Sequence, residues 1–171
     1  MDRFLVIKGD IVKAKTQAIV NAANTSLLGG GGVDGAIHKA AGKELLEECE
    51  ILGGCQTGEA KITGGFRLKA EYVIHTPGPI WRGGERKEGE LLASCYQNTL
   101  KLAAEHEIKT IAFPSISTGV YRFPVQKAAE IAVREIMNYL EQDKEMEQVQ
   151  MICFDDNTYR IYEKALKEYK S

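Results

Sequence analysis

Short apolar runs alternate with longer stretches of helical periodicity along the chain. The short runs are mostly rich in β-branched or aromatic residues, as strands are, and they cover residues 4–7, 18–20, 72–75, 110–113 and 149–154. Apolar residues at helical spacing predict helices around 37–49, 91–103, 125–140 and 161–169. This alternation predicts an α/β fold in which helices cover a largely parallel sheet.

Length and charge narrow the class of protein. The 171 residues predict one domain spanning 1–171, and we interpret the charged segment 83–89 as a surface loop, not a domain boundary. The hydrophobic fraction of 44% and the charged fraction of 27% are ordinary for a soluble globular protein. The net charge of −2 argues against binding to nucleic acid or to an anionic membrane through bulk charge.

The four cysteines lack the spacing of a metal or redox motif, because none forms a CxxC pair. The N-terminus opens directly into a strand pattern without the long apolar region of a signal peptide, and no run approaches the length of a membrane span. We therefore expect a reduced cytoplasmic protein with buried thiols and no bound metal.

Glycines gather in one segment of the chain. Six of the 17 fall between Gly29 and Gly42, and Gly30, Gly32 and Gly35 fit the pattern G-x-G-x-x-G. The run begins too far after its strand for a Rossmann dinucleotide site, and it lacks the hydroxyl residue of a P-loop. Consecutive glycines before a helix that starts near Asp34 predict a seat for a phosphate or its ribose. The alternative is a flexible turn.

A second loop, residues 115–121, follows the strand at 110–113 and precedes the helix that begins at Val125. Small hydroxyl residues and a glycine at such a turn can cradle an anion. The alternative is a plain Ser/Thr turn with a helix cap. Two such loops at one edge of a sheet suit a diphosphate.

Taken together, these segments resemble the macro domain, an ADP-ribose-binding α/β module. The matching segments cover almost the whole chain in the family's order: residues 9–11, 19–24, 29–38, 75–79, 114–124 and 154–156. A segment after Asn24 is similar to that of the bacterial O-acetyl-ADP-ribose deacetylases and the MacroD-type ADP-ribosyl hydrolases. It reads Gly-Gly-Gly-Val-Asp-Gly-Ala-Ile-His. The resemblance implies a three-layer α/β/α fold with a mixed, mostly parallel central sheet.

The resemblance implies an adenine site built from Asp10, Ile11 and Phe154. The carboxylate of Asp10 would accept a hydrogen bond from the adenine amino group, with the Ile11 backbone alongside. The alternative role for Asp10 is to cap a short helix. Phe154 would pack on adenine, as aromatic rings do on bases, or it belongs to the core.

The same resemblance assigns the ribose and the diphosphate. Asn24 would hold the distal ribose hydroxyls, because an amide both donates and accepts, whereas Asn21 is interpreted as structural. The remaining residues implied for ADP-ribose binding are Ala23, Gly31, Gly32, Val33, Ser115, Ser117, Thr118, Gly119, Val120 and Tyr121.

Asp34 and Asn24 carry the catalytic prediction. In the hydrolytic branch the aspartate that matches Asp34 orients or deprotonates the attacking water, and a helix start stabilises it as the anion. The alternative is that Asp34 is only the helix N-cap. His38 lies four residues on, on the same helix face, and we favour an orienting or packing role for it.

Arg122 departs from the family pattern, which commonly has glycine there. A side chain at this position predicts an ordinary backbone conformation, and it places a guanidinium near the diphosphate or an incoming partner.

Two functions follow from the resemblance. The first is hydrolysis of ADP-ribose adducts, either O-acetyl-ADP-ribose or mono-ADP-ribosylated proteins modified at acidic side chains, with no cofactor. The alternative is a reader module that binds ADP-ribose without turnover. Binding of RNA or a nucleotide sugar is favoured by nothing in the charge or aromatic pattern.

Overall fold

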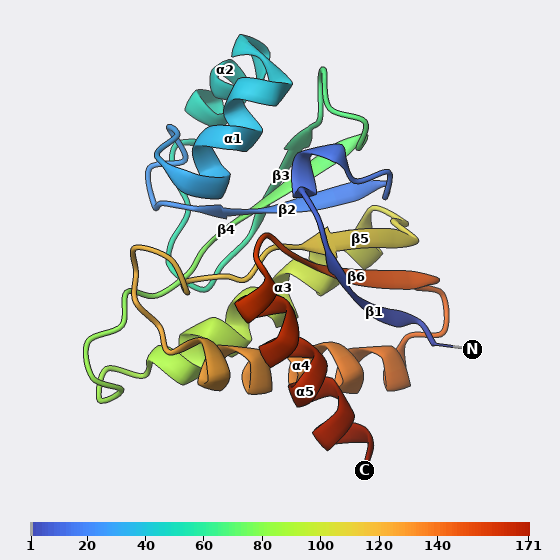
Figure 1. Ribbon diagram of the computed structural model, residues 1–171. Coiled ribbons are helices and arrows are strands. Elements are labelled where there is room, and N and C mark those ends of the chain that lie inside the picture. The colour runs from blue at the N-terminus through green and yellow to red at the C-terminus, as the bar shows by residue number, and fades with distance from the viewer. Residues whose placement is uncertain (1) are drawn as a thin grey trace.

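The computed structural model describes residues 2–171 as a mixed sheet between two layers of helices (Figure 1). The strands are β1 (Phe4–Lys8), β2 (Ala18–Ala23), β3 (Lys61–Gly64), β4 (Tyr72–Pro77), β5 (Thr110–Phe113) and β6 (Gln148–Cys153). The helices are η1 (Ile11–Lys13), α1 (Gly32–Ala41), α2 (Lys43–Leu52), α3 (Glu88–Glu105), α4 (Val125–Gln142) and α5 (Asp156–Lys170). The predicted three-layer α/β/α fold is confirmed.

The six strands lie in the order β1-β6-β5-β2-β4-β3. All neighbouring pairs are parallel except β3 and β4, which are antiparallel. The sequence pattern did not predict β3, because a strand of four residues at a sheet edge carries too little periodicity. Asn21 on β2 and His75 on β4 are register partners, so their side chains project from the same face of the sheet.

Strand β2 shows how one sheet builds two cores. Ile19 and Ala23 pack with Ile37 and Leu45 from the α1–α2 layer, while Ala18 and Val20 alternate with them and pack in the α3–α5 layer. This alternation follows from the two-residue period of a strand. Asn21 shares the face of Ile19 and Ala23, so a polar side chain enters an otherwise apolar layer beneath α1.

The helical stretch predicted at 37–49 is two helices. Gly42 separates α1 from α2 with φ 92° and ψ 178°, a conformation that L side chains rarely adopt. The helical periodicity continues across this break because both helices pack on the same apolar layer. The other three predicted helices are confirmed with longer bounds.

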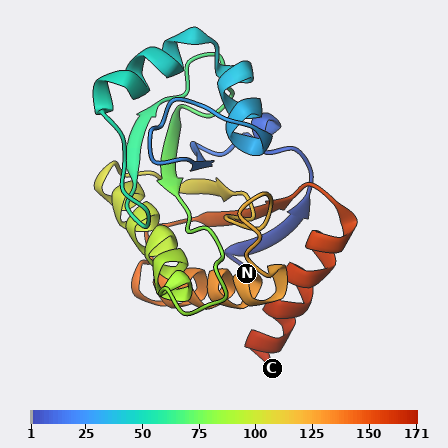
Figure 2. The ribbon, with the colours of Figure 1, turned by 90° about the vertical axis from the view of Figure 1, so that its left-hand side faces the viewer.

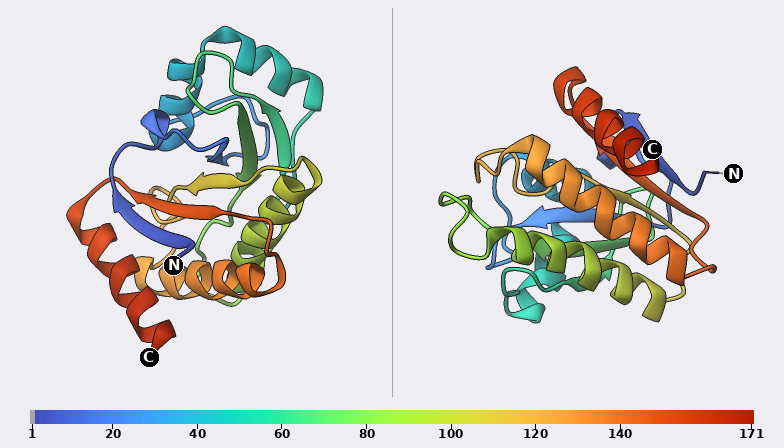
Figure 3. Two further views of the ribbon diagram at one scale, coloured as in Figure 1. Left: turned by 90° about the vertical axis from the view of Figure 1, so that its right-hand side faces the viewer. Right: turned by 90° about the horizontal axis from the view of Figure 1, so that it is seen from below.

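The layer on the opposite face consists of α3, α4 and α5, which lie side by side when the molecule is viewed from below (Figure 3). Near the chain ends, Lys170 donates a hydrogen bond of 3.2 Å from Nζ to Oδ1 of Asp2. No helix within residues 2–171 is long and apolar enough to cross a membrane.

Candidate functional site

The predicted site residues gather at one edge of the sheet. Strands β1, β2, β4, β5 and β6 are mutually parallel, so the loops that follow them emerge on the same side. This edge lies on the left of Figure 1 and faces the viewer in Figure 2. Crevices outside the carboxyl ends of strands are the usual ligand sites of open α/β sheets.

Asp34 is the most buried charged group among the predicted residues, with 5% of its surface exposed. The helix begins at Gly32 and its N-cap is Gly31, so the alternative that Asp34 is the N-cap is wrong. Asp34 Oδ1 accepts a hydrogen bond of 2.9 Å from Asn21 Nδ2. Its other oxygen, Oδ2, is buried without a hydrogen-bond partner among residues 2–171.

Asn24 and Asp34 converge on Gly30. A Cβ atom built on Gly30 would lie 3.1 Å from Asp34 Oδ2 and 3.3 Å from Asn24 Nδ2. The two predicted catalytic side chains therefore both lie next to Gly30. Asn24 also holds its own loop, because its Nδ2 donates to the Gly29 carbonyl at 2.6 Å.

Two histidines lie close to Asp34. His38 Nε2 approaches Asp34 Oδ1 at 3.4 Å, and its side chain is 14% exposed. The ring of His75 lies 6.4 Å from that of His38, centroid to centroid. His75 is fully buried, and burial, followed by the nearby charge of His38, lowers the pKa of His75 to about 3. His75 is therefore neutral at physiological pH.

A row of buried polar side chains, which we call the histidine string, runs from Asp34 across the sheet. Its members are Asn21, His75 and Thr63. Asn21 Nδ2 lies 3.1 Å from His75 Nδ1, and His75 Nε2 lies 2.9 Å from Thr63 Oγ1. Sequence reasoning gave no role to His75 or Thr63, because their contact depends on the pairing of β3 with β4.

A second row, the hydroxyl string, supports the loop after β5. Its members are Tyr162, Ser115 and Thr118. Ser115 Oγ lies 2.8 Å from the Tyr162 hydroxyl and 2.7 Å from Thr118 Oγ1, and Thr118 Oγ1 donates to the Ser115 carbonyl at 3.1 Å. Because Thr118 uses its proton on that carbonyl, Ser115 donates to Thr118 and accepts from Tyr162. Tyr162 belongs to α5 and was not predicted to contribute.

The backbone of this loop has two residues in the left-handed region. Ser117 has φ 67° and Arg122 has φ 62°. The prediction of an ordinary backbone conformation at Arg122 is therefore wrong: an arginine adopts the conformation that glycine holds more easily. The loop is closed by a hydrogen bond of 3.0 Å from Phe123 N to the Ser117 carbonyl, which fixes the turn despite the missing glycine.

Ser117 is enclosed by the loop that follows β4. Its Oγ is buried and has no hydrogen-bond partner within the described part of the chain. A Cβ on Gly78 would lie 2.1 Å from this oxygen, so a glycine is required there. Trp81 ties the two loops together by donating a hydrogen bond of 2.8 Å from its backbone N–H to the Tyr121 carbonyl.

Glu88 organises the charged segment 83–89, which we interpreted as a surface loop. Its carboxylate is 1% exposed and accepts hydrogen bonds from three backbone N–H groups, those of Arg82, Gly84 and Arg86. Burial alone would raise the pKa of Glu88, but these N–H groups hold it at about 2. The loop next to Trp81 is therefore ordered around a buried anion.

The residues predicted for adenine lie at the ends of two neighbouring strands. Asp10 Oδ1 accepts a hydrogen bond of 3.1 Å from Val12 N, so it does cap the short helix η1. Ile11 is buried. Phe154 is 80% exposed, which excludes the core role considered for it. An exposed ring next to Asp10's loop leaves an aromatic surface free for a ligand.

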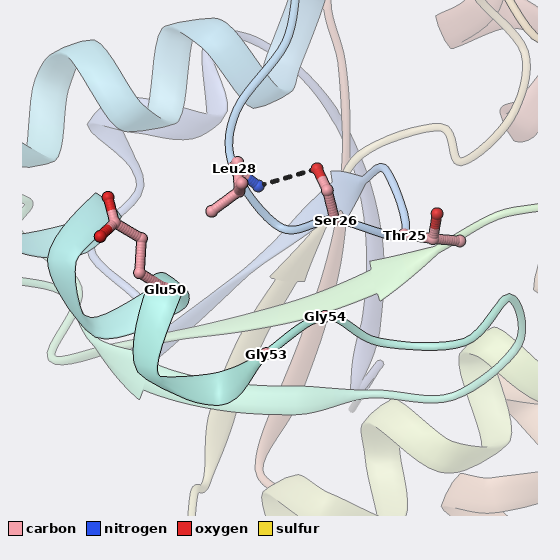
Figure 4. Close-up of a pocket in the computed structure, with 6 residues that line it drawn as sticks. All are labelled: Thr25, Ser26, Leu28, Glu50, Gly53 and Gly54. Carbon is pink, nitrogen blue, oxygen red and sulfur yellow. Dashed lines mark hydrogen bonds between the residues drawn. The ribbon is translucent and has the colours of Figure 1, made fainter.

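A shallow depression of about 410 Å³ lies on the other side of the Asn24 loop. It is lined by Thr25, Ser26, Leu28, Glu50, Gly53 and Gly54 (Figure 4). Within it, Ser26 Oγ accepts a hydrogen bond of 3.2 Å from Leu28 N. The lining includes neither Asn24 nor Asp34, so this depression lies beside the candidate site and not at it.

Comparison with known proteins places this arrangement in a family. The family model described as the macro domain matches residues 20–132. The chain is 61% identical over 160 residues to a macro domain-containing protein of Chlorobaculum tepidum, with 94% of this chain and 93% of that protein covered. It is 52% identical over 170 residues to a protein of Salmonella newport named O-acetyl-ADP-ribose deacetylase, with 97% and 95% covered.

Solved structures give the same result. The macrodomain of Oceanobacillus iheyensis with ADP has a TM-score of 0.93 and 46% sequence identity, with 96% of this chain and 90% of that chain covered. The Trypanosoma brucei macrodomain in complex with ADP-ribose has a TM-score of 0.91 and 42% identity, with 96% and 69% covered.

Proposed function

The chain belongs to the macro domain family, and we propose that it binds ADP-ribose and hydrolyses an ester bond of an ADP-ribose adduct. The observation that carries the proposal is the carboxylate of Asp34. One of its oxygens is held by Asn21, while the other is buried and free beside Asn24. A buried oxygen without a partner is costly, and a water molecule of the reaction would satisfy it.

Three parts of the edge support ADP-ribose binding. Phe154 offers an exposed ring for adenine, next to Asp10. The backbone of the loop that follows β5 offers N–H donors for the diphosphate. The start of α1, with exposed glycines at 31 and 32, offers backbone N–H groups to the distal ribose. The net charge of −2 is compatible with this, because backbone donors need no basic excess.

The proposed substrates are O-acetyl-ADP-ribose and proteins that carry ADP-ribose on acidic side chains. For the acetyl ester, the water oxygen bonds to the acyl carbon and the bond between that carbon and the ribose oxygen breaks. One proton of the water passes to Asp34 Oδ2 and then to the leaving ribose oxygen, which gives ADP-ribose and acetic acid. The acetic acid keeps the second proton of the water and releases it to solvent at neutral pH, which leaves acetate. Holding the water and the ribose together supplies much of the rate enhancement in such a reaction.

The test is a turnover assay on both substrates with wild type, Asp34→Asn and Asn24→Ala. Asp34→Asn keeps an oxygen that can accept from Asn21 but removes the carboxylate, so turnover should fall by about 100-fold or more while ADP-ribose binding persists. Calorimetry with ADP-ribose measures that binding. If wild type binds ADP-ribose but hydrolyses neither substrate, the protein is a reader module and the hydrolytic proposal fails.

A further inference from the structure

His75 lies behind the candidate site without touching it. Its side chain is fully buried in β4, between Asn21 on β2 and Thr63 on β3. Asn21 is itself fully buried, and Thr63 is 2% exposed. A histidine buried in the middle of a sheet needs a partner for each ring nitrogen, and these two neighbours supply both.

The direction of the hydrogen bonds follows from Asp34. A carboxylate only accepts, so the Asn21 atom 2.9 Å from Asp34 Oδ1 is the amide nitrogen. The same nitrogen lies 3.1 Å from His75 Nδ1 and has a second N–H to donate. His75 Nδ1 therefore accepts, and the proton of the neutral ring is on Nε2.

The other end of the ring agrees with this assignment. His75 Nε2 faces Thr63 Oγ1 at 2.9 Å, and the Thr63 hydroxyl donates to the Gly64 carbonyl at 3.1 Å. Thr63 thus uses its proton on the backbone and accepts from the imidazole. Asn21 thus gives one N–H to Asp34 and one to His75, and the imidazole gives its own N–H to Thr63. Cys49 Sγ is a more distant neighbour of Nε2, at 3.8 Å.

Two acceptors fix the orientation of the Asn21 amide, and this orientation leaves its oxygen unpaired. Its Oδ1 is buried without a hydrogen-bond partner in the part of the chain that the structure describes. Turning the amide over would bring Oδ1 against the Asp34 carboxylate and the Nδ1 lone pair of His75, and both contacts would be repulsive. His75 is therefore one of the two acceptors that keep the Asn21 amide in the orientation that directs an N–H at Asp34.

We propose that His75 is a positioning residue for the hydrolysis, acting through Asn21 to hold Asp34 Oδ1 and thereby turn Oδ2 toward Asn24 and the substrate. The inference rests on the proposed function for its effect on turnover. It requires His75 to stay neutral with its proton on Nε2, so that Nδ1 remains an acceptor. Burial of the ring favours the neutral form over the working pH range.

Two substitutions separate the two ring nitrogens. In His75→Asn an amide oxygen can replace Nδ1 as acceptor from Asn21, and the contact with Thr63 is lost. In His75→Gln the longer amide can reach Thr63 in place of Nε2, and the acceptor next to Asn21 is lost. Both variants bury a neutral amide in the same layer, so each controls for the general effect of the other.

The proposal predicts that His75→Gln lowers kcat by about tenfold or more with little change in KM, whereas His75→Asn keeps kcat within a few-fold of wild type. Affinity for ADP-ribose, measured by calorimetry, should change little in either variant. Equal losses of kcat in the two variants, at comparable thermal stability, would overturn the proposal. Thr63→Val, which is similar in shape, provides a third variant if either amide prevents folding. It removes only the partner of Nε2, so its kcat should stay within a few-fold of wild type, and a tenfold loss would contradict the proposal.

A measurement on wild type is independent of turnover. A long-range proton–nitrogen NMR spectrum of the histidine rings distinguishes the Nε2–H tautomer from the Nδ1–H tautomer and from the charged ring. We expect the Nε2–H form of His75 from neutral to mildly acidic pH. An Nδ1–H or charged ring overturns the inference whatever the activity is. Absence of wild-type turnover with an Nε2–H ring overturns the proposed function and, with it, the role of His75 in hydrolysis, but leaves the assigned hydrogen bonds standing.

Discussion

The two loops that form the candidate site rest on two different kinds of buried hydrogen-bond string. The histidine string ends on a side chain, the carboxylate of Asp34, and includes an imidazole. The hydroxyl string ends on a backbone carbonyl, that of Ser115, and consists of hydroxyl groups. One string therefore sets the direction of the Asp34 carboxylate, for which we propose the catalytic role, and the other sets the shape of a backbone turn.

This difference predicts two kinds of failure. Damage to the histidine string should reduce kcat, because the substrate still binds to a loop that is intact. Damage to the hydroxyl string should weaken binding, because the backbone donors of the 115–122 loop move while Asp34 stays in place. The strings also differ in charge chemistry. Burial lowers the pKa of His75 from 6.5 to about 3 on folding, whereas burial raises the pKa of Tyr162 and keeps it neutral.

The largest effect should come from Gly35→Ala, which attacks the glycine loop directly. A Cβ on Gly35 would lie 2.5 Å from the Gly30 carbonyl oxygen, so α1 and the loop must separate. We expect a loss of about 1–3 kcal/mol in the free energy of unfolding and a loss of turnover that exceeds the loss of binding. Urea unfolding and the turnover assay measure the two effects.

The control for Gly35→Ala is Gly89→Ala in α3. Its Cβ would lie 3.7 Å from Ile131 Cδ1, an ordinary contact, so stability should stay equal or rise. Unchanged turnover and stability in Gly35→Ala would show that the loop tolerates displacement, and the steric argument would fail.

Of the two strings, only the histidine string should make the stability of the protein depend on pH in the acid range. The pKa of His75 is about 3 in the folded protein and about 6.5 in the unfolded chain. Between these two pKa values the unfolded chain binds a proton at His75 and the folded protein does not. The free energy of unfolding therefore falls as the pH falls. From about pH 8 to about pH 5 the loss attributable to His75 is about 2 kcal/mol. It is measured by urea unfolding across this range.

The variants that test the acid effect come from both strings. His75→Gln should flatten the pH dependence above about pH 5, where carboxylates are still ionised. Tyr162→Phe should leave the slope as it is in wild type, because Tyr162 is neutral throughout. A wild-type slope in His75→Gln would mean that another group causes the loss.

A smaller effect is expected from Tyr162→Phe, which removes one donor from the hydroxyl string. The ring is fully buried and its hydroxyl lies 2.8 Å from Ser115 Oγ. Stability should fall by about 1 kcal/mol, and calorimetry should show weaker ADP-ribose binding with kcat preserved. Tyr159→Phe is the matched control on the same helix, since its hydroxyl bonds to Glu163 only. A loss confined to kcat would contradict the division of roles.

The smallest effect concerns Arg122. Because its φ is 62°, Arg122→Gly should stabilise the loop by about 0.5 kcal/mol, after allowing for the greater freedom of glycine in the unfolded chain. Arg122→Ala keeps the backbone conformation and removes the guanidinium, so it separates strain from charge. Thermal unfolding measures both variants. Stabilisation by alanine as large as that by glycine would show that the positive φ is not the cause.

The fold followed from the sequence where periodicity was strong, and the errors lie where it was weak. Amphipathic stripes such as that of α4 located helices, but Gly42 ends α1 through its backbone angles, which leave no break in the apolar pattern. Strand β3 was missed because its four residues, of which only Thr63 is buried, form too short a pattern to distinguish from a loop. The prediction for the backbone of Arg122 was wrong because the hydrogen bonds of the surrounding loop, and not the residue type, decide its conformation.

The sequence predicted the loop residues of the candidate site, but not the buried residues that hold those loops in place. Asp34 and Asn24 stand in a recognisable glycine-rich segment, so their residue types and spacing were informative. His75 and Thr63 lie far from Asp34 in the chain and join it only through the order β2-β4-β3. Tyr162 reaches Ser115 from the last helix. Contacts of this kind require the topology, which local sequence patterns do not contain.

The hydrogen bond between Asp2 and Lys170 has a practical consequence. It brings the described ends of the chain together at the start of β1 and the end of α5, while the candidate site lies at the opposite, carboxyl edge of the strands. A short peptide linker could therefore join the two ends, and new termini could be opened at the exposed residues Phe66 and Arg67, in the turn between β3 and β4. Such a permuted chain, or a fusion at either end, should leave the candidate site unobstructed. With the proposed binding of ADP-ribose, the fold would then suit a modular sensor.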